Sequence, residues 1–555
     1  MPREILPMMS AAPRLQPAEA RGVRPLDGGP ARGLRDLFAP LDDLIAGGGD
    51  LRLTIDPVRG VNEYGCGPKP SPQIWNFASS TASSISERAY ARAGLAREQL
   101  MRSTISAGLE AAYDARIEEM REELRAHLQL RTGEVDVVFS PSGTDSQLHA
   151  LFLARSLLGP ALTTIIVGSD QTGSGTAFTA RGRHFSTLTA SERSVRKDAP
   201  IVGLCGHSVA VPLIDGAAGI MARTDGDLAV LDAIDTAVAN GSSVLLQIMD
   251  SSKLGWRSPS EACLEEIANR WPDQVRIVVD ACQMRLGRRR IRRYLDRGYM
   301  VLITGSKFFG GPAFSGALLV PARLSRSLDR GEGIAPGLLD YASRSDWPKQ
   351  WVALRSPFES RQNLGQWLRW EAALEEIGAY YSVPDAFRAL ALGTLRARIE
   401  SLIMLSPSLR LVGSEPRAWS ADDEEFAHAT IFPFAISRDR GPLSVDDCRT
   451  IYRALAQDLG GVIGGSEADR DVAARRCLVG QPVRVEPPDA EPTAVLRLCI
   501  GARLVTGTWS PDACTASQNL HRELDRVAGV IAKIELLLAH DRTEFVELPY
   551  AVRVS

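Results

Sequence analysis

Short apolar runs alternate with longer segments of helical periodicity between residues 105 and 320. The runs are a few residues long and rich in Val, Ile and Leu, as expected of strands that are buried on both faces. They are Val135–Phe139, Thr163–Val167, Ser243–Met249, Ile277–Val279, Met300–Ile303 and Ala317–Val320. This alternation predicts an α/β fold, in which a mostly parallel sheet is flanked by helices on both faces.

The pattern changes near residue 384, where the regular alternation ends. The elements predicted beyond it are two strands and a last helix, namely Ala429–Ile436, Val495–Ile500 and Ser517–Leu538. Their order is typical of a smaller α+β domain. The sequence therefore predicts a large domain over residues 51–383 and a smaller one over residues 384–555.

The amino-terminal part of the chain gives weaker signals. Residues 1–50 are rich in Pro and Gly and are predicted to form a mobile extension. It contains one short helix near Leu34–Ile45, interrupted at Pro40. Residues 51–95 are dense in Gly, Pro, Asn and Ser and predict loops, whereas Ile105–Leu130 predicts a helix with exposed charge pairs.

Composition and charge argue against several classes of function. Charged residues make up 24% of the chain and the net charge is −3, so nothing favours nucleic acid or an anionic membrane surface. No apolar run reaches the roughly 18 residues of a membrane helix, and no secretory signal is visible. The eight cysteines form no CxxC pair and the seven histidines no HxxxH or HExxH spacing, so we expect no metal site and a cytoplasmic location. Five arginines between residues 288 and 293 predict a solvated helix face.

Two strand ends bring reactive side chains together. Asp280 ends one predicted strand, and Lys307 stands just past the end of the next. The carboxyl ends of parallel strands are where α/β proteins keep their active sites. A lysine amine and a carboxylate are what pyridoxal 5'-phosphate (PLP) requires, the amine for a Schiff base and the carboxylate to hold the pyridine nitrogen protonated. The small-residue turn at 140–145, between a strand and a helix, predicts an anion site, with helix capping as the alternative.

The stretch from Val275 to Val320 resembles the core of the fold-type-I PLP enzymes. It is most similar to their class V branch, which includes cysteine desulfurases, selenocysteine lyases, kynureninases and class V aminotransferases. The resemblance rests on Asp280-Ala-Cys-Gln283 and on Ser306-Lys307, where the family usually has histidine in place of the serine. It implies that Lys307 forms the Schiff base, that Asp280 pairs with the ring nitrogen and that Gln283 hydrogen-bonds the phenolic oxygen.

The resemblance also implies further contacts to the cofactor. The groups expected on the phosphate are those of Ser142, Gly143, Thr144, Thr304 and Ser306. The family often stacks a histidine on the ring, and since none is present at that place, Gln171 or Thr172 would face the ring. His184 lies further along and could also reach it, with a structural role as the alternative. Ser360 lies in a segment similar to the one that reaches the phosphate of the neighbouring subunit, which implies a homodimer.

Substrate contacts are expected from three segments. Arg497 resembles the arginine that binds the substrate α-carboxylate in the class V branch, and its guanidinium suits a bidentate pair; an ion pair in the core is the alternative. Asn62, Tyr64 and Ser80–Ser84 would line the pocket if their segment crosses the active-site mouth, with turn formation and helix capping as the alternative.

The turn after Ser243–Met249 and a late cysteine add further candidates. Ser251 or Ser252 would touch the substrate or the cofactor hydroxyl, and we select Ser252. Lys253 is a possible second amine, or else a surface or ion-pair residue. Cys477 is a possible nucleophile because the two arginines before it would lower its pKa, but the apolar residues after it suggest that it starts a strand instead.

These elements predict a PLP-dependent enzyme that acts on an α-amino acid. The late arginine and the Asp-x-x-Gln pattern most resemble those of desulfurases and kynureninases, and this resemblance implies a lyase that cleaves a side-chain bond. A class V aminotransferase is the first alternative. A catalytically inactive protein of the same fold, with a binding or regulatory function, is the second.

Overall fold

The structure is a computed structural model. It describes residues 30–215, 219–220, 223–328, 334–413, 423, 425–438, 441–485 and 493–540. The first 29 residues of the predicted mobile extension lie outside these ranges. The remainder forms α1 (Pro30–Leu37) and α2 (Leu41–Ala46), and Pro40 is the N-cap of α2, so the predicted interruption of the helix at this proline is confirmed.

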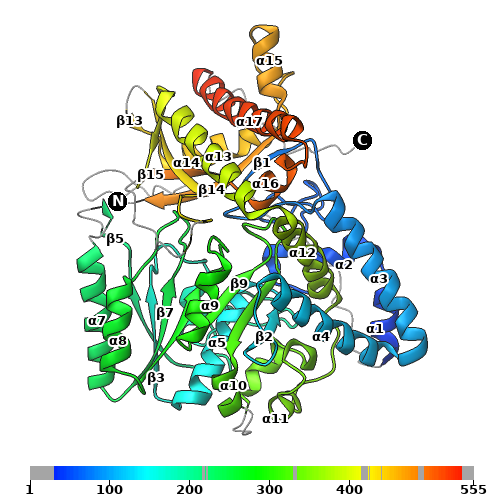
Figure 1. The fold of residues 1–555 in the computed structure, drawn as a ribbon, viewed down its shortest axis with the longest axis vertical. Helices are drawn as coiled ribbons and strands as arrows, with labels where there is room; N and C mark the ends of the chain where they lie inside the picture. Colours follow the sequence, from blue (N-terminus) through cyan, green and yellow to red (C-terminus); the bar gives the residue numbers. More distant parts are fainter. Residues whose placement is uncertain are drawn as a thin grey trace, which may run out of the picture.

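A large sheet forms the lower half of the molecule in Figure 1. Within the described ranges it has seven strands: β2 (Val135–Ser140), β10 (Gly316–Pro321), β9 (Met300–Thr304), β8 (Val275–Asp280), β7 (Ser243–Met249), β3 (Leu162–Val167) and β4 (His207–Val211). The neighbours from β9 to β4 run parallel, and β10 is antiparallel to β9 and β2. The predicted mostly parallel sheet is confirmed, and β4 is a strand that the apolar pattern did not predict.

Helices cover both faces of this sheet. On one face, Leu245 of β7 packs in the core that includes α5 (Gly143–Leu158). On the other face, Val244 and Leu246 pack in the core built with α4, α7, α8, α9 and α12, which span Leu109–His127, Arg223–Ala239, Glu261–Arg270, Arg288–Asp296 and Leu364–Ser382. Each buried aliphatic side chain contributes about 1.5–3 kcal/mol, so the two-sided burial explains why the strands are continuous apolar runs.

A second sheet lies above the first in Figure 1 and is covered by the last helix, α17 (Ala513–Ala539). Its strands are β1 (Trp75–Phe77), β14 (Cys477–Val485), β15 (Thr493–Cys499), β12 (Ile431–Arg438) and β11 (Leu409–Leu411), with β13 (Gly441–Pro442) beside β12. The other helices of this α+β part are α13 (Asp385–Leu405), α14 (Val445–Leu455), α15 (Glu467–Ala474) and α16 (Ala502–Thr508). Strand β1 pairs in parallel with β14, so the amino-terminal segment joins a sheet that otherwise comes from the end of the chain.

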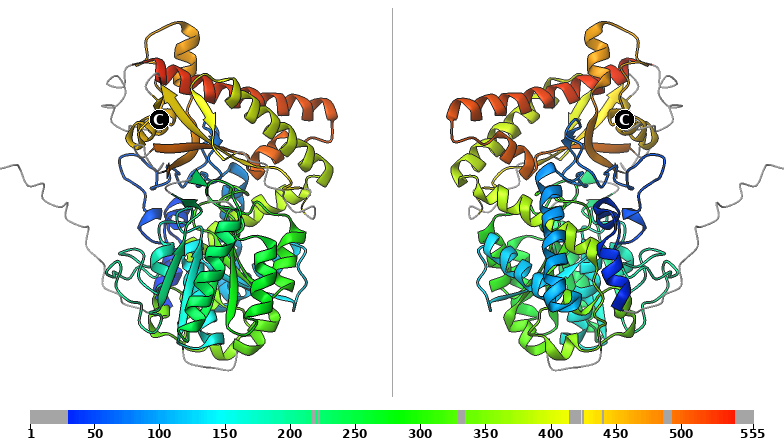
Figure 2. Two further views of the ribbon diagram at one scale, coloured as in Figure 1. Left: turned by 90° about the vertical axis from the view of Figure 1, so that its left-hand side faces the viewer. Right: turned by 90° about the vertical axis from the view of Figure 1, so that its right-hand side faces the viewer.

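The helix predicted over Ile105–Leu130 is confirmed as α4, whereas the helix before it was not predicted. α3 (Glu87–Ala107) and α4 meet at Gly108, whose φ of 78° lies in the region that favours glycine. The side views in Figure 2 show the amino-terminal helices along one flank of the large sheet. Among the helices in the described ranges, none combines the length and the apolar character needed to cross a bilayer.

Candidate active site

A cavity of about 370 Å³ lies where the carboxyl ends of β8 and β9 face the smaller sheet. Three parts of the chain line it: the strand ends of the large sheet, the loops beside β14 and β15, and the amino-terminal segment. The lining includes the predicted site residues Tyr64, Ser142, Gly143, Thr144, Gln171, Asp280, Gln283, Thr304, Ser306, Lys307 and Arg497. It also includes Ser80 and Thr81 of the predicted segment 80–84, the alternative Ser251, the second amine Lys253 and the small residue Cys282, together with Arg52, Gln147 and Gln481, which were not predicted.

Asp280 and Lys307 come from adjacent parallel strands. Asp280 ends β8 and pairs with Leu302 of β9, and Lys307 follows β9. The Asp280 carboxylate accepts a hydrogen bond from the Cys282 backbone N–H at 3.1 Å, which fixes its orientation. Gln283 is held in turn because its Nε2 donates to the Ser80 carbonyl at 3.0 Å.

The first turn of α5 forms another wall. Ser142 caps the helix, because its hydroxyl accepts from the Asp145 backbone N–H at 3.2 Å. The N–H groups of Gly143 and Thr144, which line the cavity, have no acceptor within the helix. A Cβ at Gly143 would lie 2.7 Å from the Cys282 sulfur, so only glycine permits this close approach. The Ser142 hydroxyl can therefore cap the helix while the N–H groups of Gly143 and Thr144 remain available to an anion.

Arg52 is a further cation beside this turn. Its Nη2 lies 2.6 Å from the Asp50 carboxylate, and its Nη1 donates to the Thr144 hydroxyl at 3.3 Å. The guanidinium lies between the rings of Phe185 and Phe314, at 5.5 and 5.2 Å from their centres. No local motif marked Arg52, since its contacts to α5 span 92 residues of sequence.

The opposite wall is built around Arg497 of β15, which is 3% exposed. Its Nη2 donates to the Thr81 hydroxyl at 3.1 Å and the Gln481 carbonyl at 2.8 Å, and its Nη1 donates to the Lys253 carbonyl at 3.2 Å. Burial lowers the pKa of Arg497. The predicted alternative of a core ion pair is not what the structure shows, because none of these acceptors is a carboxylate.

Thr304, Gln171 and Thr172 complete the predicted cofactor contacts in the cavity. The Thr304 hydroxyl donates to the Cys282 carbonyl at 2.7 Å. Gln171 donates from Nε2 to Asp170 at 3.2 Å, while its Oε1 is buried without a partner among the described residues. His184 does not reach the cavity, because its Nδ1 is hydrogen-bonded to the Tyr341 hydroxyl at 2.7 Å.

Asn62 and Ser252 do not line the cavity, contrary to prediction. The Asn62 side-chain oxygen accepts from the backbone N–H groups of Tyr64 and Cys66 at 3.0 and 3.1 Å, so it stabilises a turn. The Ser252 hydroxyl accepts from the N–H groups of its own loop. Its neighbour Ser251 faces the cavity instead, with a hydroxyl that has no partner among the described residues.

Cys477 and Ser360 also lie away from the cavity. Cys477 is fully buried as the first residue of β14, as the alternative of a strand start predicted. Burial raises the pKa of Cys477 to about 11 and outweighs the nearby cations Lys533 and Arg475, so the expectation of a lowered pKa was wrong. Ser360 lies in the loop before α12, and its contact with a second subunit stays a prediction.

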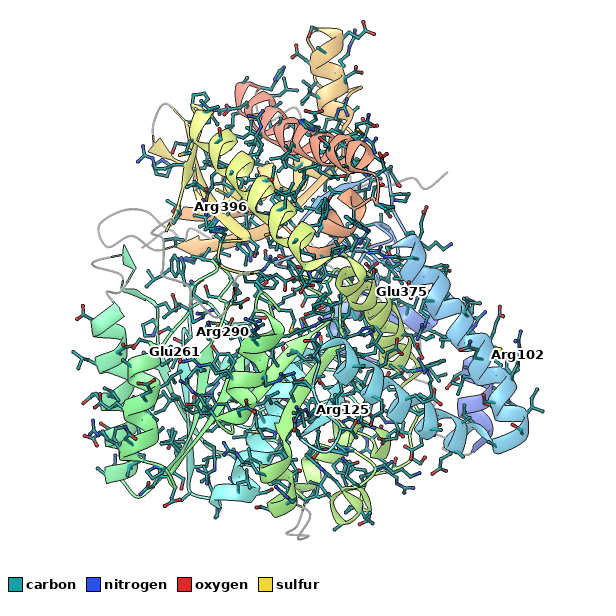
Figure 3. All side chains as sticks on the ribbon, viewed as in Figure 1. Arg102, Arg125, Glu261, Arg290, Glu375 and Arg396 are labelled. Carbon is teal, nitrogen blue, oxygen red and sulfur yellow. The ribbon has the colours of Figure 1, made fainter. Side chains whose placement is uncertain are left out.

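A buried ion-pair cluster anchors the loop after β7. The Asp250 carboxylate accepts from Arg290 Nε at 2.8 Å and from the Tyr294 hydroxyl at 2.7 Å. Burial opposes ionisation, but Arg257 and Arg290 outweigh it and lower the pKa of Asp250. Arg290 also contacts Glu261, and Figure 3 shows these two side chains next to each other. The predicted solvated arginine face is therefore wrong for Arg290, which is 3% exposed.

Comparison with known proteins gives similarity of structure alone. No family model matches this sequence, and no curated protein matches it. A NifS-like protein is similar with 14% identity and a TM-score of 0.45, over 82% of this chain and 99% of that chain. The cystine C–S lyase C-DES, in complex with cysteine persulfide, has 13% identity and a TM-score of 0.45, over 82% and 97%. The glutamate decarboxylase domain of a diaminobutyrate-pyruvate transaminase and L-2,4-diaminobutyrate decarboxylase from Vibrio parahaemolyticus has 13% identity and a TM-score of 0.44, over 82% and 81%.

Proposed function

We propose that this chain is a PLP-dependent enzyme that acts on an α-amino acid, and that it is a lyase. One observation supports this most directly: Asp280 and Lys307 extend from the ends of adjacent parallel strands into a cavity that Arg497 also lines. A carboxylate, a primary amine and a buried guanidinium are the groups that this cofactor and an α-amino acid need. We also propose that the enzyme forms a homodimer and is located in the cytoplasm.

The polar groups of the cavity wall fit the cofactor. Gln171 Oε1, Ser251 Oγ and Arg497 Nε are buried there without a partner among the described residues. Buried polar atoms of folded proteins are nearly always hydrogen-bonded, so unpartnered ones that converge on one cavity indicate a polar ligand.

Each end of the cavity suits a different part of that ligand. The N–H groups of Gly143 and Thr144, with Arg52, would hold the phosphate. Asp280 would hold a proton on the pyridine nitrogen, and Gln283 would bind the phenolic oxygen. When bound, PLP supplies an electron sink for bonds at the substrate Cα.

Two side chains would act on the substrate itself. Arg497 would bind the α-carboxylate and so fix the rotation of the substrate about its bond from nitrogen to Cα. Lys307 would hold the cofactor before the substrate arrives and then, as a free amine, move a proton at Cα.

The positions of the cysteines bear on where the cleaved side-chain fragment of the substrate goes, and they favour its release to solvent over its transfer to a cysteine. All eight are described, and Cys282 alone lines the cavity. Burial raises the pKa of Cys282 well above its usual value, and Cys477 lies elsewhere. Transfer of sulfur to a protein thiolate is therefore not part of the proposal.

Absorption spectroscopy of the purified protein with added PLP tests the proposal. A visible band that appears with wild type and with Lys349→Ala, a control at an exposed lysine, and is lost in Lys307→Ala would support it. No band in wild type would overturn it. Product analysis with a panel of amino acids then separates the reactions, since release of a side-chain fragment indicates a lyase and formation of the pyridoxamine form of the cofactor indicates an aminotransferase.

A further inference from the structure

Arg497 and Lys253 place two positive charges on one wall of the cavity. They are in direct contact, because Arg497 Nη1 donates to the Lys253 backbone carbonyl at 3.2 Å. Burial, and then the charges of Arg497 and Lys307, lower the pKa of Lys253 to about 8. The ammonium of Lys253 therefore lies in a cation-rich, partly dehydrated environment.

Among the described residues, neither cation forms an ion pair with a carboxylate. Arg497 donates to a hydroxyl and two carbonyls, and its Nε has no acceptor among the described residues. The Lys253 ammonium likewise makes no hydrogen bond or ion pair within the described ranges. Buried cations elsewhere in the described ranges are satisfied in two ways: Arg290 pairs with Asp250 at 2.8 Å, whereas Lys533 donates to backbone carbonyls. Arg497 and Lys253 differ from both because they line an open cavity, where an anionic ligand would offset the cost of two adjacent cations without a carboxylate partner.

The charges of Asp170 and Asp280 attract the Lys253 ammonium, but neither carboxylate forms an ion pair with it. Asp170 accepts from the backbone N–H groups of Leu213 and Ile214 at 2.8 and 3.2 Å. Asp280 accepts from Cys282 N–H at 3.1 Å and faces the ring nitrogen in the proposed function. Glu63 lines the cavity, but it is solvent-exposed. Within the part of the chain that the structure describes, the pair of cations therefore has no carboxylate in direct contact.

The loop that presents Lys253 is held firmly. The Ser252 hydroxyl accepts from Leu254 and Trp256 N–H at 3.1 and 3.0 Å, and Asp250 is bound by the Arg290 cluster. Because the backbone of this loop is already fixed, ligand binding has to order only the lysine side chain and not the loop. This arrangement suits recognition rather than a mobile surface lysine.

We infer that Lys253 and Arg497 together select an acidic α-amino acid, with the α-carboxylate on Arg497 and a second anionic group at the end of the side chain on Lys253. The guanidinium fork matches a carboxylate, and the ammonium, as a compact charge, accepts any oxyanion. The inference rests on the proposed function and adds the substrate class to it.

Titration calorimetry with small dianions tests the inference without turnover. The probes are succinate and glutarate, each against its monoamide, which keeps the length and one carboxylate. The full chain is measured without PLP and with saturating PLP, which covers the phosphate end of the cavity. Wild type should bind the dianions about 10- to 100-fold more tightly than the monoamides, as expected for a charged hydrogen bond. In Lys253→Met the ratio should fall close to one, whereas the surface control Lys349→Met should keep it.

Thermal unfolding of the same variants separates binding from structure. Lys253→Met should melt at or above the wild-type temperature, because it removes an unpaired cation; a lower melting temperature would indicate an intramolecular partner and would overturn the inference. A wild-type ratio near one, or an unchanged ratio in Lys253→Met, would also overturn it. If PLP binds but dianions are not preferred, the inference falls and the proposed function stands. If dianions are preferred through Lys253 but PLP does not bind, the proposed function falls and the anion site stands.

Discussion

At the scale of single residues, hydrogen-bond partners separate structural side chains from candidate functional ones. The side-chain oxygens of Asn62 and Ser252 accept hydrogen bonds from backbone N–H groups of their own turns. Gln171, Ser251 and Arg497 each keep a buried polar atom without a partner among the described residues, and all three line the same cavity. Buried atoms without a partner also occur outside the cavity, so it is the convergence of three of them on one cavity that supports the site.

The buried carboxyl of Asp145 gives a prediction about pH. Burial, and then the nearby Asp50 charge, raise the pKa of Asp145 from 3.8 to about 7. Between these values the unfolded chain loses the proton while the folded chain keeps it, so wild type loses stability as pH rises from about 4 to 7. Asp145→Asn stays neutral throughout. Its free energy of unfolding relative to wild type should rise by up to about 4 kcal/mol over that range. Urea denaturation at several pH values measures this, and a pH-independent difference would contradict it.

The sequence predicted which chemistry lies at the strand ends but not every side chain that takes part. Asp280, Gln283 and Lys307 stand at fixed offsets from apolar runs, so their convergence follows from the parallel sheet. Arg52 reaches Thr144 across 92 residues, and no local pattern encodes such a contact. The choice of Ser252 over Ser251 failed because a one-residue difference in a turn decides which hydroxyl faces the cavity.

At the scale of elements, both faces of the large sheet are buried, and this explains why its strands were recognisable. Continuous apolar runs such as Ser243–Met249 are typical of strands that are buried on both faces, and their short length distinguishes them from buried helices. β4 was missed because several of its residues are exposed. β1 was missed because it has only three residues, and its partner β14 lies 400 residues further along the chain.

The arginines of helix α9 differ in how deeply their side chains are buried. Arg290 turns inward to the fully buried Asp250, whereas Arg289 on the same helix is exposed. Arg290→Gln should lower the free energy of unfolding by about 3 kcal/mol, because it removes a partner from a buried carboxylate. Arg289→Gln is the matched control and should change it by less than about 0.5 kcal/mol. Urea denaturation at neutral pH compares the two, and equal effects would show that the Asp250 pair does not stabilise the fold.

At the scale of the whole molecule, the cavity is closed by segments that are remote in sequence. Arg52, Thr81 and Gln481 line it together with the strand ends of the large sheet. The amino-terminal segment also supplies β1 to the second sheet. The amino-terminal segment therefore links the two sheets at the place where a ligand would bind.

Ligand binding should consequently slow hydrogen exchange in all three parts of the chain at once. With saturating PLP, peptides that cover residues 50–66, 79–84 and 478–482 should exchange at least about tenfold more slowly, together with those at the ends of β8 and β9, because a bound ligand stabilises every segment that must open to release it. α15, which stands far from the cavity at the top of Figure 1, should not change. Lys307→Ala should reduce the effect, since it removes the covalent anchor. Protection confined to the large-sheet peptides would mean that the amino-terminal segment and the β14 loop do not close the site.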